Sequence, residues 1–402
     1  MTVYLFTNTY PYGKLSETFL ETEIFVAGVL NVDVVIIPLN KLDICREVVS
    51  NIKVDSGLVR MEWIKKGMIL LKMLCSRWLW KLFFQKNNPK NLFEFYQGIK
   101  YLYGAFLIRD FVLYNKKKFK KNGIFYSYWF NHTPLGLAWA MQDDYFKNYK
   151  LYTRAHGFDV YEREVGVFIP YREEALKRLK KVWVVSRYGA EYLKQKYPIF
   201  QEKIQVAHLG VSANIPKEDK IIKADISFLS CSSVIPVKRV TLIYEMINYF
   251  CKMNPQKKVC WTHIGGGDGY NDLQKIVLNK VFNMEIVLLG EVDNKTVKEI
   301  YQNNKFDVFV NLSSSEGIPV SIMEAISFGI PVVATNVGGN AEIVNVETGK
   351  LISAEVETKE FVQAVLWIME NHAELEISTM QFYKNEFNAE KNYKFFYSQL
   401  LS

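Results

Sequence analysis

Short apolar runs alternate with longer stretches of helical periodicity along the first half of the chain. The runs that we predict as strands are residues 3–8, 32–39, 124–130, 151–157 and 182–186. The segments that we predict as helices are residues 16–30, 61–84, 91–120, 134–143, 171–180 and 188–196. Apolar strands separated by helices are typical of a parallel sheet that is covered on both faces. The pattern therefore predicts a doubly wound α/β domain.

The same alternation starts again at residue 226. The second set of predicted strands is 226–233, 259–265, 284–290, 308–313 and 331–335. The predicted helices between them are 239–253, 270–280, 294–303 and 320–328. This restart predicts a second doubly wound sheet, with the polar stretch around Pro216 as the hinge. The predicted domains are 1–212 and 213–385, and an aromatic helix over 386–402 is expected to cross back onto the first domain.

The composition fits two globular domains with substantial cores. Of the 402 residues, 49% are hydrophobic and 23% are charged, as in soluble globular proteins. The five cysteines have no CxxC spacing and are expected to be buried thiols in a reducing compartment. The first residues, MTVYLFTNTY, lack the features of a leader peptide, and no apolar run of about 18 residues occurs. These features predict a cytoplasmic protein.

Positive charge is concentrated in one region of the first half. Residues 61–121 contain 14 Lys or Arg and three acidic residues, an excess of +11, whereas the whole chain carries +8. Within this region, residues 68–84 combine two Trp and two Phe with three basic residues. Two interpretations stay open, namely a peripheral contact with an anionic membrane surface and an ordinary core helix with solvated charges. Nucleic acid is not a predicted partner, because no nucleic-acid-binding signature accompanies the charge.

The segment 316–335 carries the strongest chemical signal in the chain. Glu316 and Gly317 follow a predicted strand. Pro319 suits the first turn of the next helix, and Gly329 suits its left-handed cap. The backbone amides of residues 317–321 would then face the carboxyl end of a parallel sheet, where anionic ligands bind.

Two carboxylates accompany these amides. Glu316 would reach the ligand from the loop, and Glu324 lies farther down the predicted helix. Carboxylates at this spacing can hold two different hydroxylated parts of one ligand. In combination with the glycines and the helix start, the pair indicates a site for an anionic ligand with hydroxylated parts.

These residues resemble the signature of the family-4 retaining glycosyltransferases of the GT-B fold, which is Glu, seven residues, Glu. The segments VAHLGV at 206–211 and IGGGDG at 264–269 add to the resemblance. It implies two Rossmann-like domains that face each other across a cleft. It also implies a nucleotide-sugar donor and a glycan or polyprenyl-linked acceptor, in surface polysaccharide biosynthesis.

The resemblance implies roles for residues of the second half. Glu316 would contact the donor sugar near the reacting carbon, and Glu324 would bind the ribose hydroxyls. Lys238 would neutralise the departing diphosphate, so that no metal or other cofactor is required. Further donor contacts would come from Gly13, Ser233, Arg239, Gly266, Gly267, Val292, Gly317, Ile318, Pro319 and Val320.

Two segments of the second half, around Ser232 and at 263–269, differ from familiar sequence patterns. Many family members have an arginine where this chain has Ser232, so Arg239 is expected to supply the second positive charge. The run HIGGGDG at 263–269 is not a dinucleotide-binding fingerprint, because Tyr270 stands where the last glycine would be. We interpret it as a tight turn that lets the backbone approach a diphosphate.

In the first half, His156 closes a strand at the predicted site and resembles the inter-domain histidine of the family. It would act as a catalytic residue by bonding the donor sugar. Glu17, His132 and Arg154 are predicted to contact the acceptor.

No carboxylate stands out as a nucleophile, so the expected mechanism is front-face retaining transfer, in which the leaving phosphate helps to deprotonate the acceptor. The histidines have no metal-ligand spacing. A sugar-nucleotide epimerase of the same fold and a non-catalytic, membrane-associated scaffold stay open as alternatives.

Overall fold

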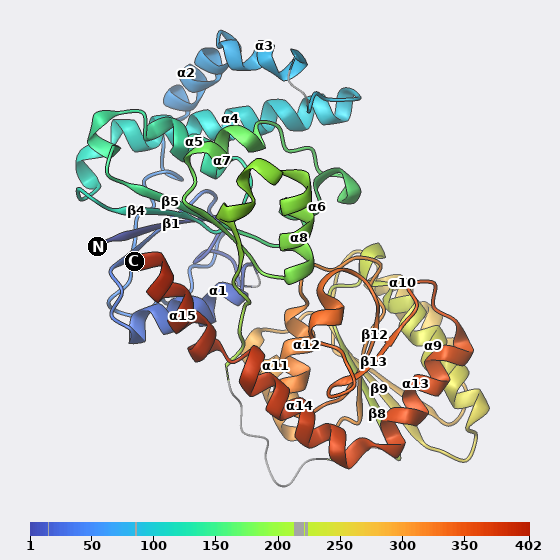
Figure 1. Ribbon diagram of the computed structural model, residues 1–402. Helices are drawn as coiled ribbons and strands as arrows, with labels where there is room; N and C mark the ends of the chain where they lie inside the picture. The colour runs from blue at the N-terminus through green and yellow to red at the C-terminus, as the bar shows by residue number, and fades with distance from the viewer. Residues whose placement is uncertain (15, 85–86, 213–220, 222–223) are drawn as a thin grey trace. The chain divides into compact units, whose positions relative to one another are not determined.

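The computed structural model describes residues 1–14, 16–84, 87–212, 221 and 224–402 (Figure 1). These residues form two compact units. The first unit comprises Met1–His208 and Tyr393–Ser402, and the second comprises Leu209–Asn392. The predicted hinge at 212–220 lies outside the described residues, apart from Ser212.

The first unit is built on a parallel sheet of seven strands in the order β3-β2-β1-β4-β5-β6-β7. The strands are β1 (Val3–Thr7), β2 (Val34–Pro38), β3 (Lys53–Val54), β4 (Ile124–Ser127), β5 (Lys150–Ala155), β6 (Lys181–Val184) and β7 (Ile204–Val206). Every residue of β1 and β4 is buried. Burial on both faces explains why these strands appear in the sequence as continuous apolar runs.

Helices cover both faces of this sheet (Figure 1). They are α1 (Phe19–Val29), α2 (Trp63–Leu74), α3 (Arg77–Phe84), α4 (Leu92–Tyr114), α5 (Thr133–Ala140), α6 (Phe158–Tyr161), α7 (Arg172–Arg178), α8 (Arg187–Lys196) and α15 (Ala389–Leu401). Helices α4, α5 and α7 lie on one face, and α1 and α15 on the other. Helices α2 and α3 form an additional layer outside α4.

The helix predicted over 61–84 is two helices. Helix α2 ends at Leu74, and α3 begins at Arg77. Between them, the hydroxyl of Ser76 donates a hydrogen bond to the carbonyl of Met73 at 2.7 Å. A serine side chain that bonds the backbone in this way competes with helix continuation. The apolar periodicity on either side gave no sign of this break.

The second unit has a parallel sheet of six strands in the order β10-β9-β8-β11-β12-β13. The strands are β8 (Ile226–Cys231), β9 (Val259–Ile264), β10 (Met284–Leu288), β11 (Val308–Asn311), β12 (Val332–Thr335) and β13 (Gly349–Ile352). The helices are α9 (Val240–Met253), α10 (Tyr270–Ile276), α11 (Asn294–Asn303), α12 (Val320–Ser327), α13 (Thr358–Glu370) and α14 (His372–Glu386). The predicted doubly wound α/β class is confirmed for both halves.

Some expectations need correction. The short strands β3, β7 and β13 were not predicted, because runs of two to four residues carry too little pattern. No disulfide links the five cysteines, all of which lie within the described residues, but Cys45 and Cys75 are exposed rather than buried. None of the helices in the described residues is long and apolar enough to span a bilayer.

Candidate functional site

The loops after the strands of the second unit meet at one edge of its sheet, because all six strands are parallel. Gly265, directly after β9, has a φ of +140°. A Cβ atom at this position would lie 1.9 Å from the carbonyl oxygen of Ser232 in the loop after β8. Only glycine permits this approach, which brings the two loops together at the carboxyl edge.

Glu316 and Lys238 form the centre of this edge. Lys238 Nζ lies 2.5 Å from Glu316 Oε1, and the glutamate is only 8% exposed. The same oxygen accepts hydrogen bonds from Ser313 Oγ at 2.7 Å and from Asn311 Nδ2 at 3.3 Å. The carboxylate is therefore held in one orientation beside a single ammonium group.

Asn311 and Ser313 were not identified from the sequence. They belong to the NLSSSE run that ends β11, where polar residues replace the apolar ones. That change at a strand's carboxyl end was the available signal.

Arg239 does not have the predicted role of a free positive charge at the diphosphate. Its guanidinium donates hydrogen bonds to three backbone carbonyls, those of Leu312, Ser313 and Ala354. All its nitrogens are thus engaged within the protein. Arg239 instead fixes the loop that carries Glu316. It has a φ of +47° and immediately precedes α9.

Gly338 and Gly339, in the loop after β12, were also missed. A Cβ atom at Gly338 would lie 1.8 Å from the carbonyl oxygen of Glu316, and one at Gly339 would lie 2.2 Å from that of Gly317. The two glycines therefore let this loop pack directly against the Glu316 backbone. The sequence VGGN after a buried strand could have indicated this.

Helix α12 begins at the same edge. Pro319 immediately precedes it rather than lying in its first turn, and Gly329 beyond its end has a φ of +75°, as predicted for a left-handed cap. Gly317 and Ile318 lie between Glu316 and the helix in the sequence, and Val320 is the first residue of the helix.

Glu324 lies on α12 and is half-buried. Burial raises the pKa of its carboxyl to about 7, and the charge of Lys298 opposes this shift. Burial also raises the pKa of the Cys231 thiol to about 12, and the neighbouring Glu324 adds to the effect. The carboxyl is thus poised between its two protonation states near neutral pH.

The other predicted donor residues flank this edge. Gly266 and Gly267 form the turn after β9, where the amide of Gly265 bonds the carbonyl of Gly290 at 2.8 Å. Val292 follows β10, and Ser233 follows β8 with an exposed side chain. Among the described residues, no group of three or more His, Cys, Asp or Glu side chains could hold a metal ion.

In the first unit, His156 lies at the end of β5 within a group of aromatic rings. Its imidazole centroid is 4.4 Å from that of Trp129 and 4.8 Å from that of Tyr128. Its backbone amide donates to Asp159 at 2.7 Å. Both ring nitrogens are buried without a hydrogen-bond partner in the part of the chain that the structure describes, and Nδ1 lies 3.8 Å from Asp159 Oδ2. Unsatisfied buried nitrogens of this kind favour a ligand-binding role.

Glu17 does not fit the predicted contact with an acceptor. Its carboxylate accepts hydrogen bonds from the amides of Thr9 and Tyr10 at 2.6 and 2.7 Å, and from Trp129 Nε1 at 2.5 Å. The residue precedes α1 with a φ of +51° and is buried. Glu17 therefore holds the loop after β1 in place and has its oxygens occupied.

Arg154 has no exposed surface and therefore cannot contact an acceptor. Its guanidinium nitrogen Nη1 lies 3.6 Å from Glu23 Oε2 on α1. Its guanidinium carbon is 4.3 Å from the ring centroid of Phe396 on α15. The residue joins α1, the sheet and the C-terminal helix.

His132 and Gly13 are both shaped by packing. The His132 ring lies so close to Gly104 of α4 that a Cβ there would be 2.3 Å from its Cδ2 atom. Burial lowers the pKa of His132 to about 4, so the ring is neutral at physiological pH. Gly13 has a φ of +84°, and its amide donates to Ile44 at 2.6 Å. Gly13 therefore lets the loop after β1 approach the backbone of Ile44, and it does not lie on an open surface.

Comparison with known proteins agrees with this arrangement. Residues 211–387, which include Lys238, Glu316 and Glu324, match the family described as Glycosyl transferases group 1. A putative colanic acid biosynthesis glycosyltransferase, WcaL of Escherichia coli, is 25% identical over 225 residues, which are 53% of this chain and 54% of that protein. The O-antigen biosynthesis glycosyltransferase WbnH of Escherichia coli is 28% identical over 40% of this chain and 44% of its own.

Solved structures match over the whole chain. Anabaena HepE in complex with UDP and glucose has a TM-score of 0.67 at 14% identity, covering 100% of this chain and 99% of its own. The pneumococcal O-GlcNAc transferase GtfA in complex with UDP and GlcNAc has a TM-score of 0.68 at 12% identity, covering 100% and 98%. These likenesses establish the fold.

The chain therefore has the GT-B fold, and its residues 211–387 are similar to the glycosyl transferases group 1. It spans about half the length of the curated relatives that it matches. The names of those relatives place them in the biosynthesis of surface polysaccharides.

Proposed function

We propose that this protein is a retaining glycosyltransferase that moves a sugar from a nucleotide-sugar donor to a glycan or lipid-linked glycan in surface polysaccharide biosynthesis. The observation that carries the proposal is the buried Glu316 carboxylate, held 2.5 Å from Lys238 at the start of α12. Glu316 would orient the donor sugar, and Lys238 would stabilise the charge that develops on the leaving diphosphate. The resemblance to family-4 enzymes supports retention of configuration by a front-face mechanism.

The surroundings of His156 support the same reaction. Its unsatisfied ring nitrogens can bond a hydroxyl of the donor sugar. Lys238 would take the place of a metal ion, so the proposed reaction needs none.

The test begins with a thermal-shift panel of nucleoside diphosphates and sugar nucleotides. The stabilising donor is then incubated with the protein and a glycan or polyprenyl-linked glycan acceptor in excess chelator, and products are followed by NMR. Release of the nucleoside diphosphate, with the anomeric configuration kept in the glycoside, is the expected result. Conversion of the donor alone into an epimer would instead support an epimerase, and failure to bind any nucleotide would support a scaffold. Loss of activity in chelator that is restored by magnesium would contradict the metal-free mechanism.

Replacement of Glu324 tests the nucleotide site directly. If this carboxylate binds the ribose hydroxyls, Glu324→Ala should weaken binding of the nucleoside diphosphate by about 1–3 kcal/mol, the value of a charged hydrogen bond. Calorimetry measures this change, and Glu285→Ala, which removes an exposed carboxylate from β10, is the matched control. Equal affinity in both variants would remove Glu324 from the site.

The pKa of about 7 for Glu324 adds a pH dependence. Only the ionised carboxylate accepts bonds from both hydroxyls, so binding should be about tenfold weaker at pH 6 than at pH 8. The titration of the nucleotide's own phosphate is separated by repeating the measurement with Glu324→Ala. That variant should lose the part of the pH dependence that belongs to the protein. A dependence that is the same in both proteins would contradict the assignment.

We also propose that the first unit rests on an anionic membrane surface. Large apolar side chains are exposed on α2, α3 and the start of α4, and Trp63, Phe84 and Leu92 are each at least 80% exposed. We call this surface the apolar face; its members are Trp63, Ile64, Met68, Leu70, Leu71, Leu74, Trp80, Phe83, Phe84, Leu92 and Phe93. Basic residues on the same helices provide charge complementary to anionic lipid.

Liposome co-sedimentation tests this proposal. The protein should bind anionic but not neutral vesicles, and binding should weaken as salt rises. Changing Lys66, Arg77 and Lys90 to Gln should weaken it by roughly 100-fold, since each basic residue contributes about 1 kcal/mol. Lys72 is unsuitable for this test, because it pairs with Asp110 at 3.0 Å.

A second pair of variants separates insertion from charge. Trp63→Ser should also reduce vesicle binding, whereas Phe282→Ser, at a residue of the second unit that is 85% exposed, should not. Wild-type protein that ignores anionic vesicles at low salt would contradict the proposal.

A further inference from the structure

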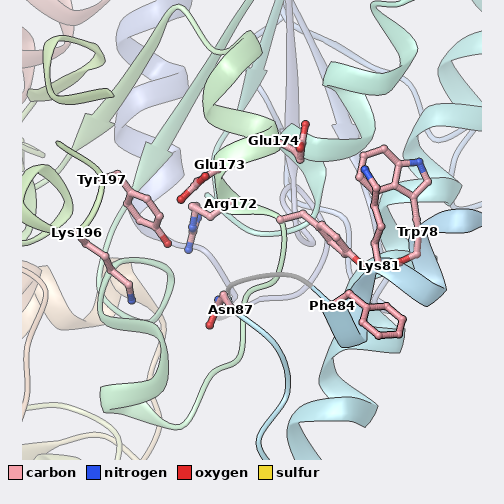
Figure 2. Close-up of a pocket in the computed structure, with 10 residues that line it drawn as sticks. Trp78, Lys81, Phe84, Asn87, Arg172, Glu173, Glu174, Lys196 and Tyr197 are labelled. Atoms are coloured by element: carbon pink, nitrogen blue, oxygen red, sulfur yellow. Dashed lines mark hydrogen bonds between the residues drawn. The ribbon is translucent and has the colours of Figure 1, made fainter. Parts of the chain in front are cut away.

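A pocket of about 610 Å³ opens in the first unit beside α3 (Figure 2). One side is formed by Trp78, Lys81 and Phe84 of α3, and the other by residues of α7 and the end of α8. Its volume is within the range of sites that hold small molecules. None of the site residues predicted from the sequence lines it.

The aromatic side of the pocket is rigid. The ring of Trp78 packs against Trp139 with centroids 4.8 Å apart, and edge to face against Tyr171 at 5.5 Å. The hydroxyl of Tyr171 donates to the backbone carbonyl of Trp78 at 2.5 Å. Lys81 Nζ lies 4.5 Å from the Trp78 ring centroid, so a cation stands beside a fixed aromatic wall.

The floor is a closed network of charges. Glu162 accepts hydrogen bonds from Arg172 Nε at 3.2 Å, from Lys196 Nζ at 2.7 Å and from the hydroxyl of Tyr197 at 3.0 Å. Arg172 and Glu162 are buried. These groups are fixed before any ligand arrives, which lowers the entropic cost of binding.

Acidic side chains complete the rim. Glu173 and Glu174 lie at the start of α7, and Glu174 is paired with Lys177 at 3.0 Å. Glu173 is exposed and points into the space shown in Figure 2. Its carboxylate can accept hydrogen bonds from a ligand with several hydroxyl groups.

This combination selects one class of ligand. A bare hydrocarbon would place apolar surface against Lys196 and Glu173, both charged, at a desolvation cost. A polyanion would place negative charge against Glu173 and Glu174, so Lys81, Arg172 and Lys196 do not make the pocket a purely cationic site. A saccharide meets every demand, because its C–H face packs on an aromatic ring while its hydroxyls bond to cations and carboxylates.

The pocket also adjoins the apolar face, and the buried Asp159 connects Arg172 of the pocket to His156. Phe84 belongs to both the pocket and the apolar face. On the inner side, Arg172 donates to the carbonyl of Asp159 at 2.7 Å, and Asp159 accepts from the amide of His156 at 2.7 Å. A ligand with a sugar head and an apolar tail can therefore place its head in the pocket and its tail along Phe84 and the apolar face.

We propose that this pocket binds a saccharide unit of an amphipathic glycoconjugate, whose apolar chain lies along α3. That the glycoconjugate is the acceptor rests on the proposed function. Saccharide binding itself does not require a donor, so the two can be tested separately.

The test uses n-octyl β-D-maltoside, below its micelle concentration, as the probe. The signal of the Trp78 indole N–H, assigned with Trp78→Phe, is followed by NMR during titration of the full chain. It should shift on addition of the maltoside. A control titration uses n-octylphosphocholine, which has the same alkyl chain and no sugar. It should bind more weakly than the maltoside by a factor of about five or more.

Charge reversal at the rim tests the sugar contacts. Glu173→Lys should weaken maltoside binding about fivefold or more, whereas Glu191→Lys, an exposed glutamate of α8 outside the pocket, should leave it unchanged. Affinity for the nucleoside diphosphate should be the same in both variants. Equal binding of the two amphiphiles, or maltoside binding that is indifferent to Glu173→Lys, would overturn the proposal.

The outcomes for the two proposals are distinguishable. If the maltoside binds as expected but no nucleotide does, the glycan pocket stands and the transferase assignment fails. If nucleotides bind and the maltoside does not shift Trp78, the transferase assignment stands and the pocket proposal fails.

Discussion

Lys238→Ala should lower the rate of sugar transfer by about 100-fold or more, which is the usual loss of rate when one electrostatic donor is removed from an active site. The ammonium group lies 2.5 Å from Glu316. The loop that carries Glu316 packs against Gly338 and Gly339 at a distance that leaves no room for a Cβ atom. The diphosphate gains negative charge as the glycosidic bond breaks, and Arg239, the neighbouring cation in the sequence, is engaged by backbone carbonyls. Turnover of the purified variant, at saturating donor, measures the effect.

A purely structural role for Lys238 must be separated from this. Loss of the lysine leaves Glu316 with its bonds from Ser313 and Asn311, so the loop should keep its shape. The nucleoside diphosphate should therefore still bind, with a change smaller than the change in turnover. Lys305→Ala is the matched control, because Lys305 lies 3.8 Å from Asp307 in the same unit but away from the proposed site. Near-normal turnover of Lys238→Ala, or an equal loss in Lys305→Ala, would contradict the proposed role.

The architecture was predictable because burial on both faces leaves a strong mark on the sequence. Strands such as β1 and β11 have buried residues throughout, so they appear as unbroken apolar runs between amphipathic helices. Boundaries were less accessible. At the break between α2 and α3, the hydroxyl of Ser76 bonds a backbone carbonyl. Serine side chains in helices do not always form such a bond, so the sequence did not indicate the break.

The partners of individual charges were not predictable in the same way. Arg154, Arg239 and Glu17 stand next to motif residues and were assigned to ligands for that reason. Each instead contacts groups far away in the sequence, namely Glu23 for Arg154, Trp129 for Glu17 and Ala354 for Arg239. Pairings over this separation depend on the folded topology. Proximity to a motif therefore indicated where the loops converge, but not which side chains in them remain available.

Arg154→Leu should destabilise the first unit by about 3–5 kcal/mol, because it leaves the buried carboxylate of Glu23 without its cation. Both side chains are completely buried, and burial already raises the pKa of Glu23, which Arg154 opposes. Phe396 of α15 packs on the guanidinium, so the C-terminal helix should lose protection from hydrogen exchange in this variant.

The double variant Glu23→Leu with Arg154→Leu separates the cost of an unpaired charge from the loss of packing. Removing both charges should restore much of the stability, since apolar replacements of a buried ion pair are often neutral. Chemical unfolding followed by hydrogen exchange of the first unit measures both variants, with Arg178→Leu, at an exposed residue of α7, as the control. A loss below about 1 kcal/mol for Arg154→Leu, or a double variant no more stable than the single one, would show that the ion pair does not anchor α15 in the way that its burial and geometry imply.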